Sequence, residues 1–212
     1  MDVSDDVEKL VERIMTEKGV EAIPSLIDLL TDEDEKVRET VLQIIYRFGD
    51  TARPILLQKY REHIKMCQQN DVVLLYLVDI LSDFGETSIK KDLYNLLSKY
   101  DDESAQLVIY EAICKLKDGE KIFDVLAYYL LEDEYREELA TQVIMALSHV
   151  PTPRTIEVLA RAYRDERFTQ DIKKDIVQAI SMLTMKDPKL WDHFEKIADR
   201  QLISEVKTFT NV

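Results

Sequence analysis

Only one pair of side chains in this sequence has the spacing of a reactive or metal-binding site. His63 and Cys67 stand four residues apart, so on a helix they share a face, as two ligands of one metal ion do. No third or fourth ligand is evident, which favours a surface pair. His149 and His193 have no evident catalytic partner. The sequence therefore predicts no metal site, no catalytic residues and no cofactor.

Other motifs that carry chemistry are missing from the sequence. It contains no glycine-rich phosphate loop, no nucleophile elbow and no paired-cysteine metal motif, so we expect a protein that is not an enzyme. Cys67 and Cys114 are too far apart to indicate a disulfide framework. The acidic start MDVSDDVEKL lacks the apolar stretch of a signal peptide, and no segment approaches ~18 consecutive apolar residues. These features predict a cytoplasmic protein without a membrane partner.

The formal net charge of −14 is distributed unevenly along the chain. Residues 1–50 carry 14 acidic and 6 basic side chains, whereas residues 150–212 carry 10 and 11. An acidic surface repels nucleic-acid phosphates and anionic membranes, so we expect no nucleic-acid partner. It favours solubility and is compatible with a basic protein partner; a solvated surface without a specific role is the alternative.

The elements that position these side chains are indicated by one apolar pattern that occurs five times. Windows that begin at Val37, Val73, Ala105, Arg136 and Ile172 follow one another at steps of 36, 32, 31 and 36 residues. Positions 1, 5, 8, 9 and 12 of each window are apolar, and Arg136 is the only exception among the twenty-five. This spacing is typical of one face of a helix. A repeat of this length indicates helix pairs stacked into an array, with the second helix of each pair as its core.

The predicted organisation is a single all-α domain over residues 1–200, followed by a tail of unassigned structure over 201–212. Residues 1–18 form an N-terminal capping helix with Ser4 as a plausible N-cap. The five repeats cover 19–49, 50–85, 86–117, 118–150 and 151–185, and residues 186–200 form a C-terminal capping helix. Pro24 and Pro54 lie in the first turns of helices, Asn70 is the expected cap of the second helix of repeat 2, and Gly49 and Gly85 end helices.

The helix-pair unit, Pro24 in a first helix, and the Asp34-x-x-Val37-Arg38 start of a second helix resemble HEAT repeats, including those of bilin-lyase-type proteins. The resemblance implies a right-handed α-solenoid of about five helix pairs, and a ladder between repeats that uses Asp32 and Arg38. Some HEAT-like proteins are di-iron hydroxylases with His-Glu pairs, and this chain has no His-Glu dipeptide. Others resemble DNA glycosylases with a basic groove, which this chain also lacks.

A partner-binding surface is predicted on the second helices, on the side away from the apolar pattern. In arrays of the resembled family these helices line the concave face. The predicted partner-binding residues are Glu39, Leu42, Gln43, Tyr46, Leu75, Val78, Asp79, Leu107, Tyr110, Glu111, Gln142, Met145 and Gln178. The mixture of apolar and short polar side chains favours an extended peptide or an amphipathic helix, and Asp79 and Glu111 favour a basic one. Packing of Leu75, Val78 and Leu107 against adjacent helices is the alternative.

A cluster of basic residues near the last repeat, here the C-terminal basic cluster, comprises Arg154, Arg161, Arg164, Arg167, Lys173 and Lys174. It can hold an anion, form ion pairs with Glu157, Asp165 and Asp171, or meet the acidic half of another copy head to tail. The leading hypothesis is a non-enzymatic scaffold that binds a protein or peptide on its concave face. The alternatives are an enzyme-associated subunit that holds a small ligand, as in bilin lyases, and a structural subunit that stacks through its ends.

Overall fold

The computed structural model describes residues 3–132 and 136–210, with side chains for 8–132 and 139–209. Every regular element in these ranges is a helix, which confirms the all-α class. Ser4, Arg136 and Glu138, which the sequence places at a helix start and on the second helices, have side chains outside the described residues. The chain divides into two compact units, residues 1–101 and 102–212.

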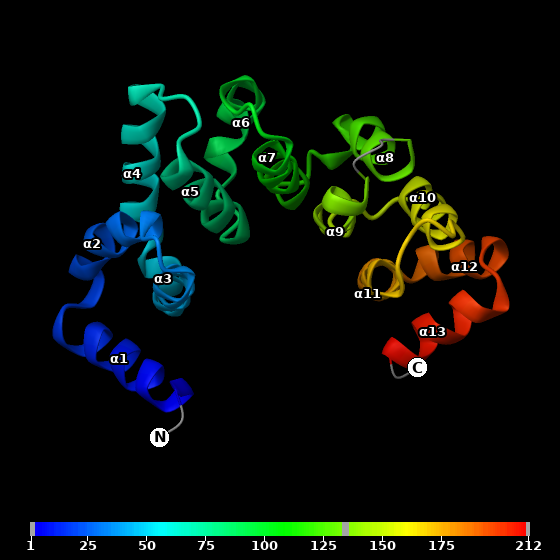
Figure 1. Ribbon diagram of the computed structural model, residues 1–212, viewed down its shortest axis with the longest axis horizontal. Helices are drawn as coiled ribbons and strands as arrows, with labels where there is room; N and C mark the ends of the chain where they lie inside the picture. Colours follow the sequence, from blue (N-terminus) through cyan, green and yellow to red (C-terminus); the bar gives the residue numbers. More distant parts are fainter. Residues whose placement is uncertain (1–2, 133–135, 211–212) are drawn as a thin grey trace. The chain divides into compact units, whose positions relative to one another are not determined.

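The α-helices described in the first unit are α1 (Val3–Glu17), α2 (Ile23–Asp28), α3 (Glu35–Phe48), α4 (Arg53–Met66), α5 (Val72–Asp83) and α6 (Lys90–Leu96). Short 3-10 turns occur between them, namely η1 (Gly19–Ala22), η2 (Leu29–Thr31), η3 (Gly49–Thr51), η4 (Thr87–Ile89) and η5 (Leu97–Lys99). Consecutive helices pack as pairs, α2 on α3 and α4 on α5 (Figure 1). In addition α1 contacts α3, and α2 contacts α4, so neighbouring pairs lie side by side.

The α-helices described in the second unit are α7 (Glu103–Lys115), α8 (Phe123–Leu131), α9 (Arg136–Leu147), α10 (Pro153–Tyr163), α11 (Gln170–Lys186), α12 (Pro188–Ile197) and α13 (Arg200–Thr210), with one 3-10 turn, η6 (Gly119–Lys121). They form two rows. One row is the sequence of contacts α7 to α9, α9 to α11 and α11 to α13. The other is α8 to α10 and α10 to α12, and the rows meet through α8 on α9 and α10 on α11. Helices α9, α10 and α11 therefore have neighbours on several sides.

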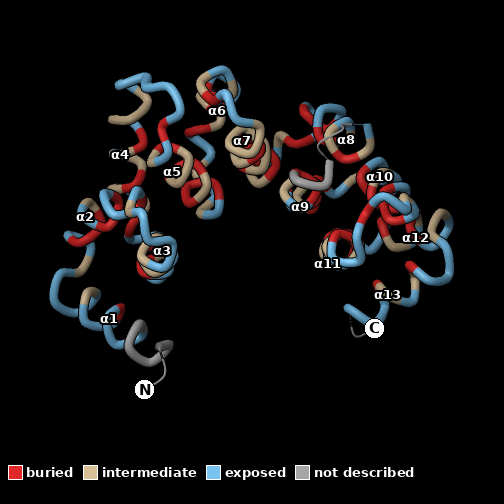
Figure 2. Tube along the Cα trace, in the orientation of Figure 1, coloured by how far each residue is buried: buried red, intermediate tan, exposed pale blue. Residues whose placement is uncertain are grey.

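The apolar pattern of the sequence marks the core of both units. Of the twenty residues in its last four columns, nineteen are buried, and Phe84 alone is half-buried. Buried positions lie mainly where helices face one another (Figure 2). Full burial of a Leu or Ile side chain contributes about 1.5–3 kcal/mol, so these columns account for much of the stability of each unit. The helix α5 is covered on several sides, because Leu74, Val78 and Leu81 are all buried.

Several helix ends agree with the sequence and one is corrected. Pro24, Pro54 and Pro153 lie at the first turns of α2, α4 and α10, where a missing N–H costs little. Gly49 and Gly85 follow α3 and α5 with positive φ. The prediction that Asn70 caps α5 is wrong: Asp71 is the cap, and its Oδ1 accepts a hydrogen bond from the Leu74 amide at 3.0 Å.

The segment after residue 200, left unassigned by the sequence, is the helix α13, which packs against α11. Its buried residues are Leu202 and Val206, both fully inaccessible to solvent. Asp199 caps it, since its Oδ1 accepts from the Leu202 amide at 2.9 Å. The spacing of Leu202, Val206 and Phe209 behind a capping Asp199 is a helical signal that the sequence contained.

A close approach in the second unit generates the first prediction. A Cβ at Gly119 would lie 2.4 Å from Val150 Cγ2 and 2.9 Å from Cys114 Sγ, so only glycine fits between α7 and the loop after α9. We expect Gly119→Ala to lower the free energy of unfolding by about 1–3 kcal/mol through overpacking. The measurement is urea unfolding followed by fluorescence of Trp191, the single tryptophan, which lies in this unit.

A second variant separates overpacking from a backbone effect. In a Val150→Ala background the nearest clashing atom is gone, so Gly119→Ala is expected to cost less than in the wild type. An equal cost in both backgrounds would contradict the steric explanation.

Candidate functional site

The predicted partner-binding residues of the first unit differ in exposure. Glu39, Gln43 and Tyr46 are exposed, and Leu42, Leu75 and Asp79 are half-buried. Val78 is 0% exposed and therefore belongs to the core, not to a surface. This burial fits the alternative that Val78 packs against an adjacent helix.

Tyr46 links the two second helices of this unit. Its hydroxyl donates to Asp83 Oδ2 at 2.5 Å, and its ring meets Phe84 edge-on at 5.8 Å between centroids. Because these contacts join α3 to α5, Tyr46 contributes to the packing of these two helices. The exposed part of its ring, 38% of the residue, remains on the surface.

The predicted residues of the second unit are also unequal. Leu107 is 1% exposed and is part of the core. Glu111 forms an ion pair at 3.0 Å with Lys115 of the same helix, so its charge is compensated within the unit. Met145 is 42% exposed and Gln178 is exposed, whereas Gln142 is half-buried. The remaining member is Tyr110, also half-buried, and its burial raises the pKa of its hydroxyl.

A groove of about 690 Å³ lies between α11 and α13. From α11 it is lined by Lys174, Asp175, Val177 and Gln178, and from α13 by Ser204, Glu205, Thr208 and Phe209. We call it the α11–α13 groove. Val177 is the one buried member, and the ring of Phe209 is 53% exposed. The groove thus combines one predicted partner-binding residue, Gln178, with a helix that the sequence left unassigned.

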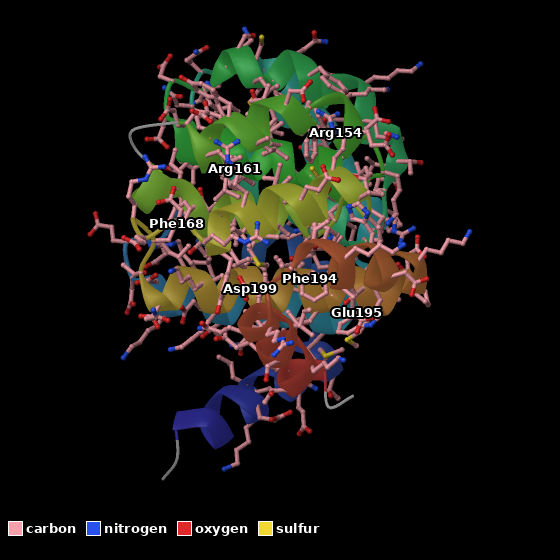
Figure 3. The ribbon with its side chains drawn as sticks, turned by 90° about the vertical axis from the view of Figure 1, so that its right-hand side faces the viewer. Arg154, Arg161, Phe168, Phe194, Glu195 and Asp199 are labelled. Carbon is pink, nitrogen blue, oxygen red and sulfur yellow. The ribbon has the colours of Figure 1, made fainter. Side chains whose placement is uncertain are left out.

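A second groove, of about 360 Å³, lies between α8 and α10, and we call it the α8–α10 groove. Four of its charged residues form two ion pairs, Arg154 with Asp124 at 2.6 Å and Arg161 with Glu132 at 3.2 Å. Arg154 also lies 4.4 Å from the centroid of the Phe123 ring. Both arginines project from α10 toward α8, at separate places along the helix (Figure 3).

The rest of the C-terminal basic cluster is dispersed in the same way. Arg164 donates to the Ile197 carbonyl beside Asp199, Arg167 pairs with Asp165 at 2.5 Å, and Lys174 pairs with Asp171 at 2.9 Å. Lys173 lies over the ring of Tyr163. The expected ion pairs of Asp165 and Asp171 are thus present, while Glu157 pairs with His193 at 3.0 Å instead. Each of the six cations has its own contact, so they do not form one anion site.

The pair His63 and Cys67 borders a small cavity of about 150 Å³ in the first unit. His63 Nδ1 is hydrogen-bonded at 2.7 Å not to Cys67 but to Oδ2 of Asp71, a residue 5% exposed. The carbonyl oxygen of Asp71 accepts from Tyr100 at 2.8 Å. Asp71 therefore joins α4, α5 and the loop after α6, and the His63 ring is held by the cap of α5.

Two tyrosines near this cavity lie next to aspartate residues. Burial, together with the neighbouring Asp71 carboxylate, raises the pKa of Tyr100. Burial and the carboxylate of Asp92, 3.3 Å away, likewise raise the pKa of Tyr60. Both hydroxyls thus stay protonated over the whole physiological range and can act as hydrogen-bond donors to the adjacent acceptors.

Arg38 donates to main-chain oxygens of its own turn, those of Asp32 at 2.5 Å and Glu33 at 3.1 Å. The Asp32 carboxylate accepts from the Asp34 amide at 2.9 Å. These contacts close the turn before α3. The implied ladder between repeats is therefore replaced by local bonds at this position.

Among the described residues no group of three or more His, Cys, Asp or Glu side chains is arranged to hold a metal ion. Nor does any helix in the described ranges have the length and apolar character needed to cross a bilayer. No protein-family model, curated protein or solved structure matches the chain.

The contacts of Asp71 lead to a prediction for the first unit. Asp71→Ala removes the α5 cap and leaves His63 Nδ1 without its acceptor. We therefore expect the stability of α5 to fall by about 2–4 kcal/mol. Asp34→Ala removes the exposed cap of α3, which accepts from Lys36, and should cost only ~1 kcal/mol. The measurement is the free energy of opening of α5 and α3 from native-state hydrogen exchange. Equal losses for the two variants would contradict a special role for Asp71.

Cys114 generates a prediction about thiol reactivity. It is 0% exposed, and burial, with a smaller effect of Glu111, raises its pKa to about 12. A raised pKa means that the thiolate is scarce below that pH, so Cys114 is expected to be inert near pH 8. Titration of the native chain with a disulfide reagent should modify one thiol, the exposed Cys67, and denatured chain should yield two. Prompt modification of the one remaining thiol in native Cys67→Ser would overturn this expectation.

Proposed function

We propose that this protein is a non-enzymatic interaction module, a right-handed α-solenoid of HEAT-like helix pairs that binds a segment of a partner protein. The binding place is the α11–α13 groove. The observation that carries the proposal is this groove of about 690 Å³, with Phe209 53% exposed at its edge. Exposed aromatic side chains beside a hollow are a common anchor for protein partners.

The solenoid part of the proposal is supported by the sequence repeat and by the contacts within each unit. In the second unit each helix of one row touches the next, and the two rows cover one another. Helix-pair repeats that bury their apolar faces only against neighbours pack in this manner. The resemblance of Pro24, Asp34, Val37 and Arg38 to HEAT repeats agrees with it.

A polypeptide suits the α11–α13 groove better than an enclosed small ligand. Five of its eight lining residues are exposed, so the groove is open along its length. Sites for small ligands usually enclose most of the ligand surface. The Gln178 amide has no hydrogen-bond partner among the described residues, so it can pair with a peptide main chain.

We also propose a cytoplasmic location. Both cysteines are free thiols in the structure, and Cys67 is exposed, which suits a reducing compartment. The overall acidic charge makes nucleic acid an unfavourable partner.

The test uses a random-peptide phage library panned against the immobilised full chain. Enriched peptides are synthesised, and their affinity is measured by isothermal titration calorimetry for the wild type and for Phe209→Ser. Loss of the aromatic anchor is expected to weaken binding roughly 10-fold, which corresponds to ~1.4 kcal/mol.

Met185→Ser is the matched control, because Met185 lies on α11 outside the groove and is 67% exposed. It should leave the affinity unchanged. Tyr128→Ser tests the α8–α10 groove, since Tyr128 is 57% exposed there. Peptides that bind wild type and Phe209→Ser equally, or a library without enrichment, would refute the proposed site.

A further inference from the structure

The α11–α13 groove carries two carboxylates that lack a cation. Asp175 Oδ2 accepts from the Thr141 hydroxyl at 2.8 Å, and Glu205 Oε1 accepts from the Gln201 amide at 3.1 Å. Both donors are neutral, and neither carboxylate has a cationic partner among the described residues. The Tyr163 hydroxyl is a further neutral hydrogen-bond partner of Glu205. The groove therefore presents two uncompensated negative charges beside an apolar surface.

The single cation that lines the groove does not cancel this charge. Lys174 Nζ is bound 2.9 Å from Asp171 Oδ1, and both side chains are largely exposed. Each member of that pair strengthens the charged form of the other: Asp171 raises the pKa of Lys174, and Lys174 lowers the pKa of Asp171. The charges of Lys174 and Asp171 thus compensate one another. The electrostatic potential in the groove is therefore negative, because of Asp175 and Glu205.

The α8–α10 groove provides the contrast within the same unit. There, Asp124 and Glu132 each have an arginine partner, Arg154 and Arg161. A bound cation would have to displace these arginines, whereas in the α11–α13 groove it would meet carboxylates that have none. Charge complementarity therefore selects the α11–α13 groove for a basic partner.

We infer that the partner segment is a basic polypeptide with a Lys or Arg next to an apolar residue. The apolar side chain packs on Phe209 and Val177, and the cation lies between Asp175 and Glu205. The exposed Gln178 amide and Ser204 hydroxyl are available to the segment's main chain. This inference rests on the proposed function, because it names the chemical class of partner for the same groove.

The test reads the composition of the peptides that the full chain enriches from the random-peptide phage library. Lys and Arg are expected to be over-represented, next to an apolar residue, relative to the unselected library. For an enriched peptide, replacement of its basic residues by Ser should weaken binding roughly 3- to 10-fold at low salt. Added salt should reduce this difference, because exposed charges are screened.

Two double variants with the same change of net charge locate the effect. Asp175→Asn/Glu205→Gln keeps hydrogen-bond acceptors in the groove, and it should remove the preference for the basic peptide over its Ser analogue. Asp124→Asn/Glu132→Gln acts in the α8–α10 groove and should leave the preference intact. Circular dichroism checks that both variants remain folded.

The outcomes separate the two proposals. Enrichment of neutral or acidic peptides that still lose affinity on Phe209→Ser would overturn the basic class and keep the groove as the binding place. Equal loss of preference in both double variants would likewise overturn it, since general attraction to an acidic protein would then explain the result. Peptides insensitive to Phe209→Ser would overturn the proposed function itself.

Discussion

The candidate site depends on one apolar contact, the packing of α13 on α11. Leu202 and Val206 are fully buried, and α13 contacts α11 among the described helices of its row. Burial of these two side chains contributes about 1.5–3 kcal/mol each, which is enough to hold a helix of eleven residues that would be marginal alone. Without this contact, Phe209, Ser204 and Glu205 would not face α11, and the α11–α13 groove would not exist.

The core was predictable because buried positions on a helix recur in the sequence with the helical period. The apolar positions in the windows that contain Val41 and Ile176 recur at helical spacing, and nearly all of them are buried. Helix starts were predictable where the side chain itself makes the bond. Asp102 and Thr169 begin α7 and α11 in this way, and both accept from amides three residues on. The choice between Asn70 and Asp71 was not predictable, because both can cap a helix. It depends on Asn70 being held at positive φ by the loop after α6, through Asp101 and Lys99.

The surface was less predictable than the core. A residue that points away from the partner helix of its own helix pair is exposed only if no further helix covers it. Val78 and Leu107 were placed on the predicted partner-binding surface by their angle on one helix, yet they are buried. The angle of a residue on its own helix does not say which neighbouring helices cover its apolar flanks. The partners of charged side chains could not be predicted from the sequence either, since Glu157 pairs with His193, thirty-six residues away.

Hydrogen bonds between polar side chains support two of the contacts between helices. Tyr46 joins α3 to Asp83 of α5, and Thr141 joins α9 to Asp175 of α11. Among the described residues, no such bond joins Gln178 or Glu205 across the α11–α13 contact, where the buried residues are apolar. The polar groups of Tyr46 and Thr141 are thus used for packing between helices, whereas Gln178 stays on the surface of α11.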